Sequence, residues 1–297
     1  MDDAPTELID INESQGFLLE DVNIRGALVR LGSTWRRIAA MHRYPAELDD
    51  LLGEGLAATV LLASGLKSQP SVSLQLQGAG RLRLLLAQCT GALRVRGMAQ
   101  LAVGESGSDA SQPLLGEGRL VVNLDTGQPK GLFQGIVPLV STSLERCLER
   151  YFEQSEQLAT RLVLRTTGER VAGLLLQVLP GRDESAGRAA FGAVAGRAER
   201  VTTAALAERP AEELLPALFA EHAIRLFSAR GVSQDCRCTP ERLAGVLRML
   251  GRDELDSMLT DDGHVELNCE FCNRAFRYDD AGIDAALSGG APSAALH

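Results

Sequence analysis

Two hydrophobic periodicities alternate along the first 180 residues. Apolar residues at helical spacing predict helices over residues 34–43, 46–66 and 143–157. Apolar residues at every second position, bounded by glycine and proline, predict strands between them. The strand candidates are "FLLEDVNIRGALVRL", "SVSLQLQ", "RLRLLLAQ", "ALRVRGMAQ", "RLVVNLD", "LFQGIVPLV", "TRLVLRTT" and "AGLLLQVLP". Strands in runs, with helices grouped between the runs, predict an α+β domain over residues 1–180.

The pattern changes after Pro180. Residues 181–235 are rich in alanine and in charges of both signs, and we interpret them as a helical linker. Glycines make any helix over 181–200 marginal, because glycine is a poor helix former. A stronger helix is predicted over 210–231, with Gly231 as its C-cap. Its apolar stripe is Leu215, Leu218, Phe219 and Leu226. The stripe indicates a helix packed on the main domain; a helix that covers a binding surface and can be released is the alternative.

Residues 236–297 form a third, small unit. Thr239 suits an N-cap and Pro240 the first helical position, and Gly251 ends the helix. A short second helix and the segment "HVELNCEFCNRAFRY" follow, and the segment predicts a hairpin with Cys269 and Cys272 at its tip. The predicted fold class is therefore α+β overall: an N-terminal mixed domain, a helical linker and a C-terminal zinc-binding module.

Charge and composition narrow the classes of function. The 297-residue chain has a net charge of −9 and no cluster of basic residues, which argues against nucleic acid as a partner. Its apolar runs are too short to span a bilayer, so no membrane partner is expected. The N-terminus "MDDAPTELID" is acidic and unlike a signal peptide. We therefore expect a cytoplasmic protein, in which paired cysteines indicate metal or redox chemistry more than structural disulfides.

Four of the six cysteines lie in two tight pairs, Cys236 with Cys238 and Cys269 with Cys272. Four thiolates suit Zn²⁺, which accepts tetrahedral sulfur, so the pairs predict one zinc ion with no open position. The unit has few core residues, so metal binding would supply much of its folding free energy. Clustered thiolates are also oxidisable, and oxidation would remove the ligands and unfold the unit. Spacing alone permits such a switch but leaves a purely structural zinc ribbon open.

The other chemistry-bearing residues indicate less. Cys89 and Cys147 occupy apolar positions and are interpreted as buried structural thiols. His42 and His222 have no ligand spacing, and His264 lies near the cysteines without being needed by them. No catalytic triad or paired carboxylates stand out, so we expect no enzyme. A thiol–disulfide oxidoreductase is disfavoured, because Cys269 and Cys272 lack the βαβ context of that chemistry.

The motif "CRCTPER", a thirty-residue gap and "CEFCN" form a distinctive pattern near the C-terminal end. This pattern resembles the redox-switch module of the heat-shock protein 33 family, the redox-regulated bacterial chaperones. "YFEQSEQLATRL", "AGLLLQVLP", "LQLQGAGRLRLLL" and "RGMAQ" resemble stretches of its main domain. The likeness covers most of the chain and is most specific in the last quarter.

The resemblance implies a holdase chaperone. By this likeness Cys236, Cys238, Cys269 and Cys272 would bind one zinc ion in a reduced, inactive form. Oxidation would form disulfides within each pair, release zinc and unfold the linker, exposing a surface that holds unfolding client proteins. A homodimer is implied for the oxidised form. The alternative from another class is a structural zinc-ribbon adaptor that binds a fixed partner.

Overall fold

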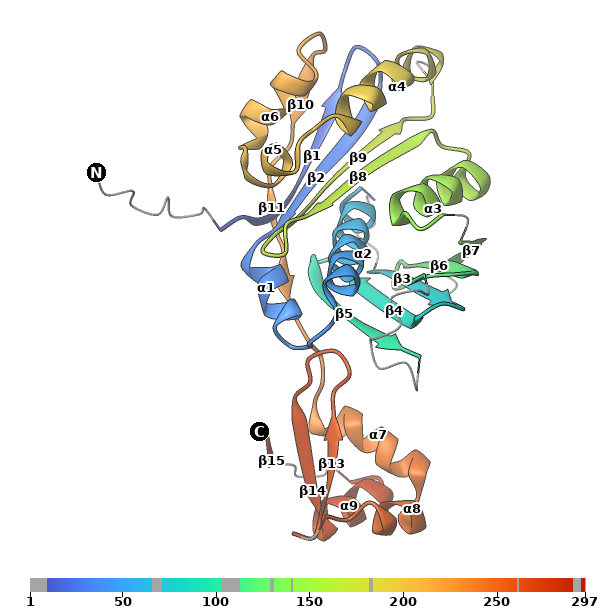
Figure 1. The fold of residues 1–297 in the computed structure, drawn as a ribbon, viewed down its shortest axis with the longest axis vertical. Helices are drawn as coiled ribbons and strands as arrows, with labels where there is room; N and C mark the ends of the chain where they lie inside the picture. The colour runs from blue at the N-terminus through green and yellow to red at the C-terminus, as the bar shows by residue number, and fades with distance from the viewer. Residues whose placement is uncertain are drawn as a thin grey trace, which may run out of the picture. The chain divides into compact units, whose positions relative to one another are not determined.

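The computed structural model describes residues 10–65, 71–102, 113–128, 131–139, 141–181, 184–260, 262–290 and 295–296. The chain divides into two compact units, residues 1–234 and 235–297. Both contain helices and strands, as Figure 1 shows, and the predicted α+β class is confirmed. No described helix is long and apolar enough to cross a bilayer.

The first unit contains two sheets of mostly antiparallel strands. The first sheet has the order β10-β1-β2-β9-β8, and β11 also pairs with β1. Its strands are β1 (Asn12–Leu19), β2 (Ile24–Leu31), β8 (Thr160–Thr166), β9 (Val171–Val178), β10 (Ile224–Leu226) and β11 (Arg230–Gly231). The second sheet has the order β12-β5-β4-β3-β6-β7. Its strands are β3 (Ser71–Gly78), β4 (Leu82–Cys89), β5 (Arg94–Leu101), β6 (Gly118–Asp125), β7 (Leu132–Pro138) and β12 (Ser233–Gln234).

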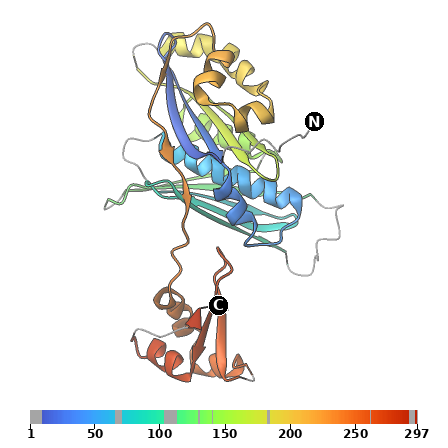
Figure 2. The ribbon, with the colours of Figure 1, turned by 90° about the vertical axis from the view of Figure 1, so that its left-hand side faces the viewer.

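Helix α2 (Ala46–Ser64) lies between the two sheets (Figures 1 and 2). Its acidic residues lie in the first half, and every residue from Gly55 to Ala63 is buried, as expected of a helix segment enclosed on every face. Gly97 of β5 lets the helix approach closely, because a Cβ there would lie 2.8 Å from Leu52 and 3.2 Å from Leu56. Helix α1 (Ser33–Ala39), helix α3 (Leu144–Tyr151) and a π-helical turn (Phe152–Glu156) complete this layer. The three helices predicted in the first domain are thus confirmed.

Three helices cover the other face of the first sheet. They are α4 (Glu184–Glu199), α5 (Thr203–Glu208) and α6 (Ala211–Leu218). Alternation along the strands separates the two faces: Leu175 points to the α2 side, whereas Leu174 and Leu176 pack under these helices. Residues 184–234 therefore belong to the same compact unit as the sheets. We call the segment from α4 to α6 the cap.

A helix is present where a marginal one was predicted: α4 occupies 16 residues and packs on β8 and β9, which supports a helix of weak propensity. Another expectation for this segment was wrong. The helix predicted over 210–231 ends at Leu218. Ile224 and Leu226 instead pair with Leu19 and Phe17 along the edge of β1. Their apolar spacing fits both a helix and a strand, and the unpaired edge of β1 decides for the strand.

The second unit is small. Its elements are α7 (Pro240–Leu250), α8 (Arg252–Ser257), β13 (His264–Asn268), β14 (Ala275–Asp279), α9 (Asp280–Leu287) and β15 (Ala295–Leu296). The Thr239 hydroxyl accepts the Arg242 N–H at 3.3 Å, which confirms the predicted N-cap. Helix α9 was not predicted. Its N-cap is Asp279, whose carboxylate accepts the Gly282 N–H at 2.8 Å, and aspartate is a residue type that indicates a helix start in a sequence. The core of this unit comprises Ala244, Leu247, Leu255, Val265, Cys269, Phe276, Tyr278, Ile283 and Ala286.

Candidate metal centre

The structure brings the four predicted cysteines together. The sulfurs of Cys236, Cys238, Cys269 and Cys272 all lie within 4.8 Å of one another. The closest contacts join the two pairs: Cys236 Sγ to Cys269 Sγ at 3.5 Å, and Cys238 Sγ to Cys272 Sγ at 3.4 Å. Among the described residues, no other group of three or more cysteines, histidines or acids has this arrangement. Four converging sulfurs could hold one metal ion.

The hairpin between β13 and β14 positions two of these sulfurs. The Cys269 N–H donates to the Arg274 carbonyl at 3.0 Å, and the Asn273 N–H donates to the Cys269 carbonyl at 2.7 Å. Asn273 adopts φ 54°, a left-handed conformation that asparagine tolerates better than most residues. These contacts turn the chain tightly, so both cysteines of the CxxC pair face the same point.

The other two sulfurs precede helix α7. Cys238 lies next to the N-cap Thr239, and the Tyr278 hydroxyl of β14 donates to the Pro240 carbonyl at 2.9 Å. This hydrogen bond joins the start of α7 to the hairpin strand. The arm that carries Cys236 and Cys238 is therefore fixed to the same core as the hairpin.

The electrostatics differ among the thiols. Burial raises the pKa of Cys236 to about 11, and burial together with neighbouring thiols raises the pKa of Cys238 above its ordinary value. Burial also acts on Cys269, but the backbone N–H groups of Phe271 and Cys272 outweigh it and lower the pKa of Cys269. Backbone donors that stabilise a thiolate are the feature expected of a metal knuckle. A bound divalent cation would favour the thiolate form of all four.

The remaining candidates lie elsewhere, as predicted for the two single cysteines. Cys89 is 1% exposed and Cys147 is fully buried. Burial raises the pKa of Cys89 to about 12, which disfavours the reactive thiolate. His264 begins β13, at the opposite end of the strand from Cys269, and does not join the sulfur group.

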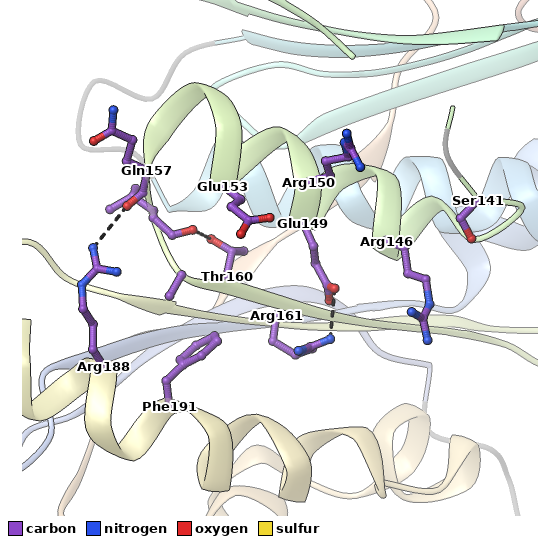
Figure 3. A pocket seen from close by; sticks show the side chains of 12 residues that line it. Ser141, Arg146, Glu149, Arg150, Glu153, Gln157, Thr160, Arg161, Arg188 and Phe191 are labelled. Atoms are coloured by element: carbon purple, nitrogen blue, oxygen red, sulfur yellow. Dashed lines mark hydrogen bonds and ion pairs between the residues drawn. The ribbon is translucent and has the colours of Figure 1, made fainter. Parts of the chain in front are cut away.

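A separate cleft of about 780 Å³ lies in the first unit, between α3, the start of β8 and α4 (Figure 3). Arg161 of β8 reaches Glu149 of α3 at 3.0 Å and Glu199 at the end of α4 at 3.1 Å. Arg188 of α4 donates to the Gln157 carbonyl at 3.5 Å. Acidic and basic side chains both line this cleft, and the ion pair with Glu199 and the hydrogen bond from Arg188 link α4 to the rest of the first unit. We see no catalytic arrangement in it.

Comparisons with known proteins agree with this arrangement. The family model described as "Hsp33 protein" matches residues 12–279. The chain is 40% identical to the 33 kDa chaperonin of Nitrosococcus oceani over 89% of this chain and 90% of that protein. It is 37% identical to the 33 kDa chaperonin of Shewanella woodyi over 92% of this chain and 94% of that protein.

A solved structure shows the same fold. The crystal structure of the 33 kDa chaperonin from Thermotoga maritima superposes with a TM-score of 0.76 at 22% identity, covering 94% of this chain and 99% of that one. The family model and the relatives' names point to a chaperone and not to an enzyme. The chain belongs to the Hsp33 protein family.

Proposed function

We propose that this chain is a redox-regulated holdase whose four clustered cysteines bind one zinc ion in the reduced, inactive form. The single observation that carries the proposal is the convergence of four sulfurs within 4.8 Å. Tetrahedral Zn²⁺ with Zn–S bonds of about 2.3 Å requires sulfurs about 3.8 Å apart. The contacts of 3.4 and 3.5 Å and the upper limit of 4.8 Å bracket that spacing. Cys236, Cys238, Cys269 and Cys272 would then fill all four positions, which makes the zinc structural.

The oxidation step follows from thiol chemistry. A thiolate attacks hydrogen peroxide and becomes a sulfenic acid, with loss of one hydroxide that leaves as water. A neighbouring thiol then attacks the sulfenic sulfur, forming a disulfide and releasing a second water. One peroxide molecule thus oxidises one cysteine pair. Disulfide sulfurs are poor metal ligands, so the oxidised pairs can no longer hold the site together.

Which sulfurs pair decides whether the unit opens. Disulfides between the pairs, such as Cys236 with Cys269, would keep the arm before α7 tied to the hairpin. Disulfides within each pair leave the arm and the hairpin unconnected, so only the small core would hold the unit. A core of this size is insufficient without a cross-link or metal. The family resemblance implies disulfides within Cys236–Cys238 and within Cys269–Cys272, and we propose this pairing although the sulfur contacts of 3.5 and 3.4 Å in the reduced structure join the two motifs.

Peptide mapping distinguishes these pairings directly. Trypsin cleaves after arginine and yields the peptides 231–237, 238–242 and 253–274. If the disulfides form within each motif, peptides 231–237 and 238–242 will be linked to each other by a disulfide. Peptide 253–274 will then contain an internal disulfide. A three-peptide complex in the oxidised protein would instead show pairing between the motifs.

The proposed client surface is the face of the first sheet under the cap. Its apolar side chains are Phe17, Leu19, Ile24, Leu28, Val163, Ala172, Leu174, Leu176 and Val178. All are at most 2% exposed beneath the helices of the cap. A continuous apolar face of this kind, once uncovered, would bind exposed apolar segments of unfolding proteins. Residues 181–235 take the role of the releasable linker in this proposal.

Packing and hydrogen bonds together hold the cap, and the segment that follows it, on the rest of the first unit. Arg30 is buried and donates to the Leu206 carbonyl at 3.2 Å and to the Arg209 carbonyl. Asp21 accepts hydrogen bonds from His222 at 2.8 Å and from the Ala223 N–H at 3.0 Å. Cys236 follows the last residue of β12 by two positions, so the second unit is joined directly to the segment that runs from the cap through β10, β11 and β12. We propose that unfolding of the second unit loosens this segment and with it the cap.

A structural zinc-ribbon adaptor remains the second candidate. The observation that favours it is an exposed apolar face of α7, where Met249 is 88% and Val246 45% exposed. An adaptor would retain its metal under mild peroxide and bind one fixed partner. For either function we propose a cytoplasmic location and no nucleic-acid or membrane partner; the holdase is also proposed to form a homodimer when oxidised.

One experiment tests the proposal. Reduced protein is treated with peroxide, metal release is followed with a chromogenic chelator, and aggregation of a thermally unfolding client is followed by light scattering in the same sample. We expect one zinc ion per reduced chain, little protection before oxidation, and protection that rises with metal release. Unchanged light scattering after complete release would contradict the holdase. Metal that stays bound under peroxide would favour the adaptor.

A further inference from the structure

Strand β7 is an unprotected sheet edge. Its seven residues, "LFQGIVP", carry no charge, and no described strand pairs with its outer side. Leu132, Phe133 and Ile136 are 65%, 61% and 55% exposed. Proteins normally protect edges by shortness, charge or proline. Here Pro138, at the very end of the strand, is the single such device.

The other described edges of the first unit differ from β7. Strands β10, β11 and β12 have only two or three residues each. Strand β8 carries Arg161 and Arg165. Among the described edge strands of the first unit, only β7 is both apolar and uncharged. Since the other edges are short or charged, this exposed apolar edge indicates a binding partner.

The hydrogen bonds between β6 and β7 determine which backbone groups of β7 point outward. The Leu139 N–H donates to the Gly118 carbonyl at 2.9 Å, and the Thr126 N–H donates to the Gly131 carbonyl at 3.0 Å. Odd-numbered residues of this strand thus bond to β6. Because bonding direction alternates along an antiparallel strand, Leu132, Gln134 and Ile136 direct their N–H and C=O groups outward.

We propose that two copies of the chain pair antiparallel through β7, with Gln134 opposite the partner's Gln134. This inference rests on the proposed oxidised homodimer and assigns its interface. In this register Leu132 lies opposite the partner's Ile136, and each of the three outward residue pairs can exchange two backbone hydrogen bonds. Pro138, which has no N–H, stays outside the paired segment.

The side chains suit a two-fold axis. Cross-strand pairs of large apolar residues stabilise a sheet, and Leu132 with the partner's Ile136 forms such a pair twice. Phe133, on the other face, meets the partner's Gly135. No charged side chain of the strand meets its own copy, so a molecule of net charge −9 has no like-charge contact within the paired segment. A second copy therefore pairs the outward backbone groups of β7 and also supplies apolar contacts on both faces of the strand.

The axis allows a sharp test in the oxidised full-length protein. Gln134→Lys and Gln134→Glu each place a charge opposite its own copy, so we expect each to weaken dimerisation about a hundredfold or more. An equimolar mixture of the two variants places Lys opposite Glu and should recover the dimer. Gln75→Lys, on the central strand β3 with neighbours on both sides, is the matched control and should leave the mass unchanged. Sedimentation gives the masses, and circular dichroism verifies the fold of each variant.

The outcomes separate two failures. A wild-type oxidised protein that is monomeric would overturn the dimer and this interface together. An oxidised dimer that survives both Gln134 variants would overturn the interface alone. Folded variants whose mixture stays monomeric would show that Gln134 does not lie on the axis. Loss of client protection without loss of the dimer would mean that the edge binds clients instead of a second copy.

Discussion

The sheet β10-β1-β2-β9-β8 is covered on both faces, and the two covers are built differently. One is α2, a single helix of 19 residues, 13 of them buried, that lies between two sheets. The other is the cap, in which α4 contains Gly187, Gly192 and Gly196, and α6 contains Pro216. Glycine and proline weaken a helix, so the cap depends on packing for its structure. Under the proposed function, the face beneath α2 stays covered and the face beneath the cap is uncovered on oxidation.

The largest expected effect comes from removing one ligand. Cys236→Ser should abolish metal binding, and loss of a structural zinc costs on the order of 10 kcal/mol of folding free energy. We expect residues of the second unit to lose protection in hydrogen exchange and the cap to exchange faster, while α2 keeps its protection.

Cys147→Ser is the matched control, because Cys147 is fully buried in the α2 core and outside the sulfur group. It should keep the metal and a protected second unit. If Cys236→Ser reduced protection in α2 as much as in the cap, the claim that only the cap is released would be contradicted.

Two leucines test the covers against each other. Leu61 in α2 and Leu215 in α6 are 0% and 1% exposed, so truncation to alanine should cost about 2–5 kcal/mol in either case. Leu61→Ala should lower the melting temperature of the whole first unit. Leu215→Ala should instead loosen the cap, so that the reduced protein begins to suppress client aggregation. Identical behaviour of the two variants in both assays would contradict the account.

The smallest effects concern the glycines of α4. A Cβ at Gly192 meets open space, and one at Gly196 reaches only the end of Arg200 at 4.0 Å. Alanine at each should stabilise the helix by up to about 1 kcal/mol, because glycine is the weaker helix former. The double variant Gly192→Ala/Gly196→Ala should therefore need more oxidant to suppress client aggregation, measured by light scattering, to the same extent.

Gly187→Ala gives the opposite expectation from the same substitution. A Cβ at Gly187 would lie 2.8 Å from Val178 and 2.9 Å from the Val22 carbonyl. The clash should push α4 away from the sheet and lower the oxidant requirement. If all three alanine substitutions changed the amount of oxidant needed for activation in the same direction, the packing of the cap would not determine that amount.

The sequence predicted the candidate metal centre more completely than the cap. Thr239, Pro240 and the CxC and CxxC spacings are local signals, so the helix start and the hairpin could be predicted without any tertiary contact. The convergence of the two pairs followed from the chemistry of four thiols. The end of α6 could not be predicted in this way, because Ile224 and Leu226 become strand residues only through the free edge of β1. The length of α4 likewise depends on packing against β8 and β9.

Hydrogen exchange on peroxide-treated protein, with client aggregation assayed in the same sample, tests whether oxidation releases the cap. We expect α4, α5 and α6 to lose protection together with the second unit, while α2 and the strands beneath the cap stay protected. Client binding should rise as exchange of the cap rises. Full client protection while the cap remains as protected as in the reduced protein would contradict this release.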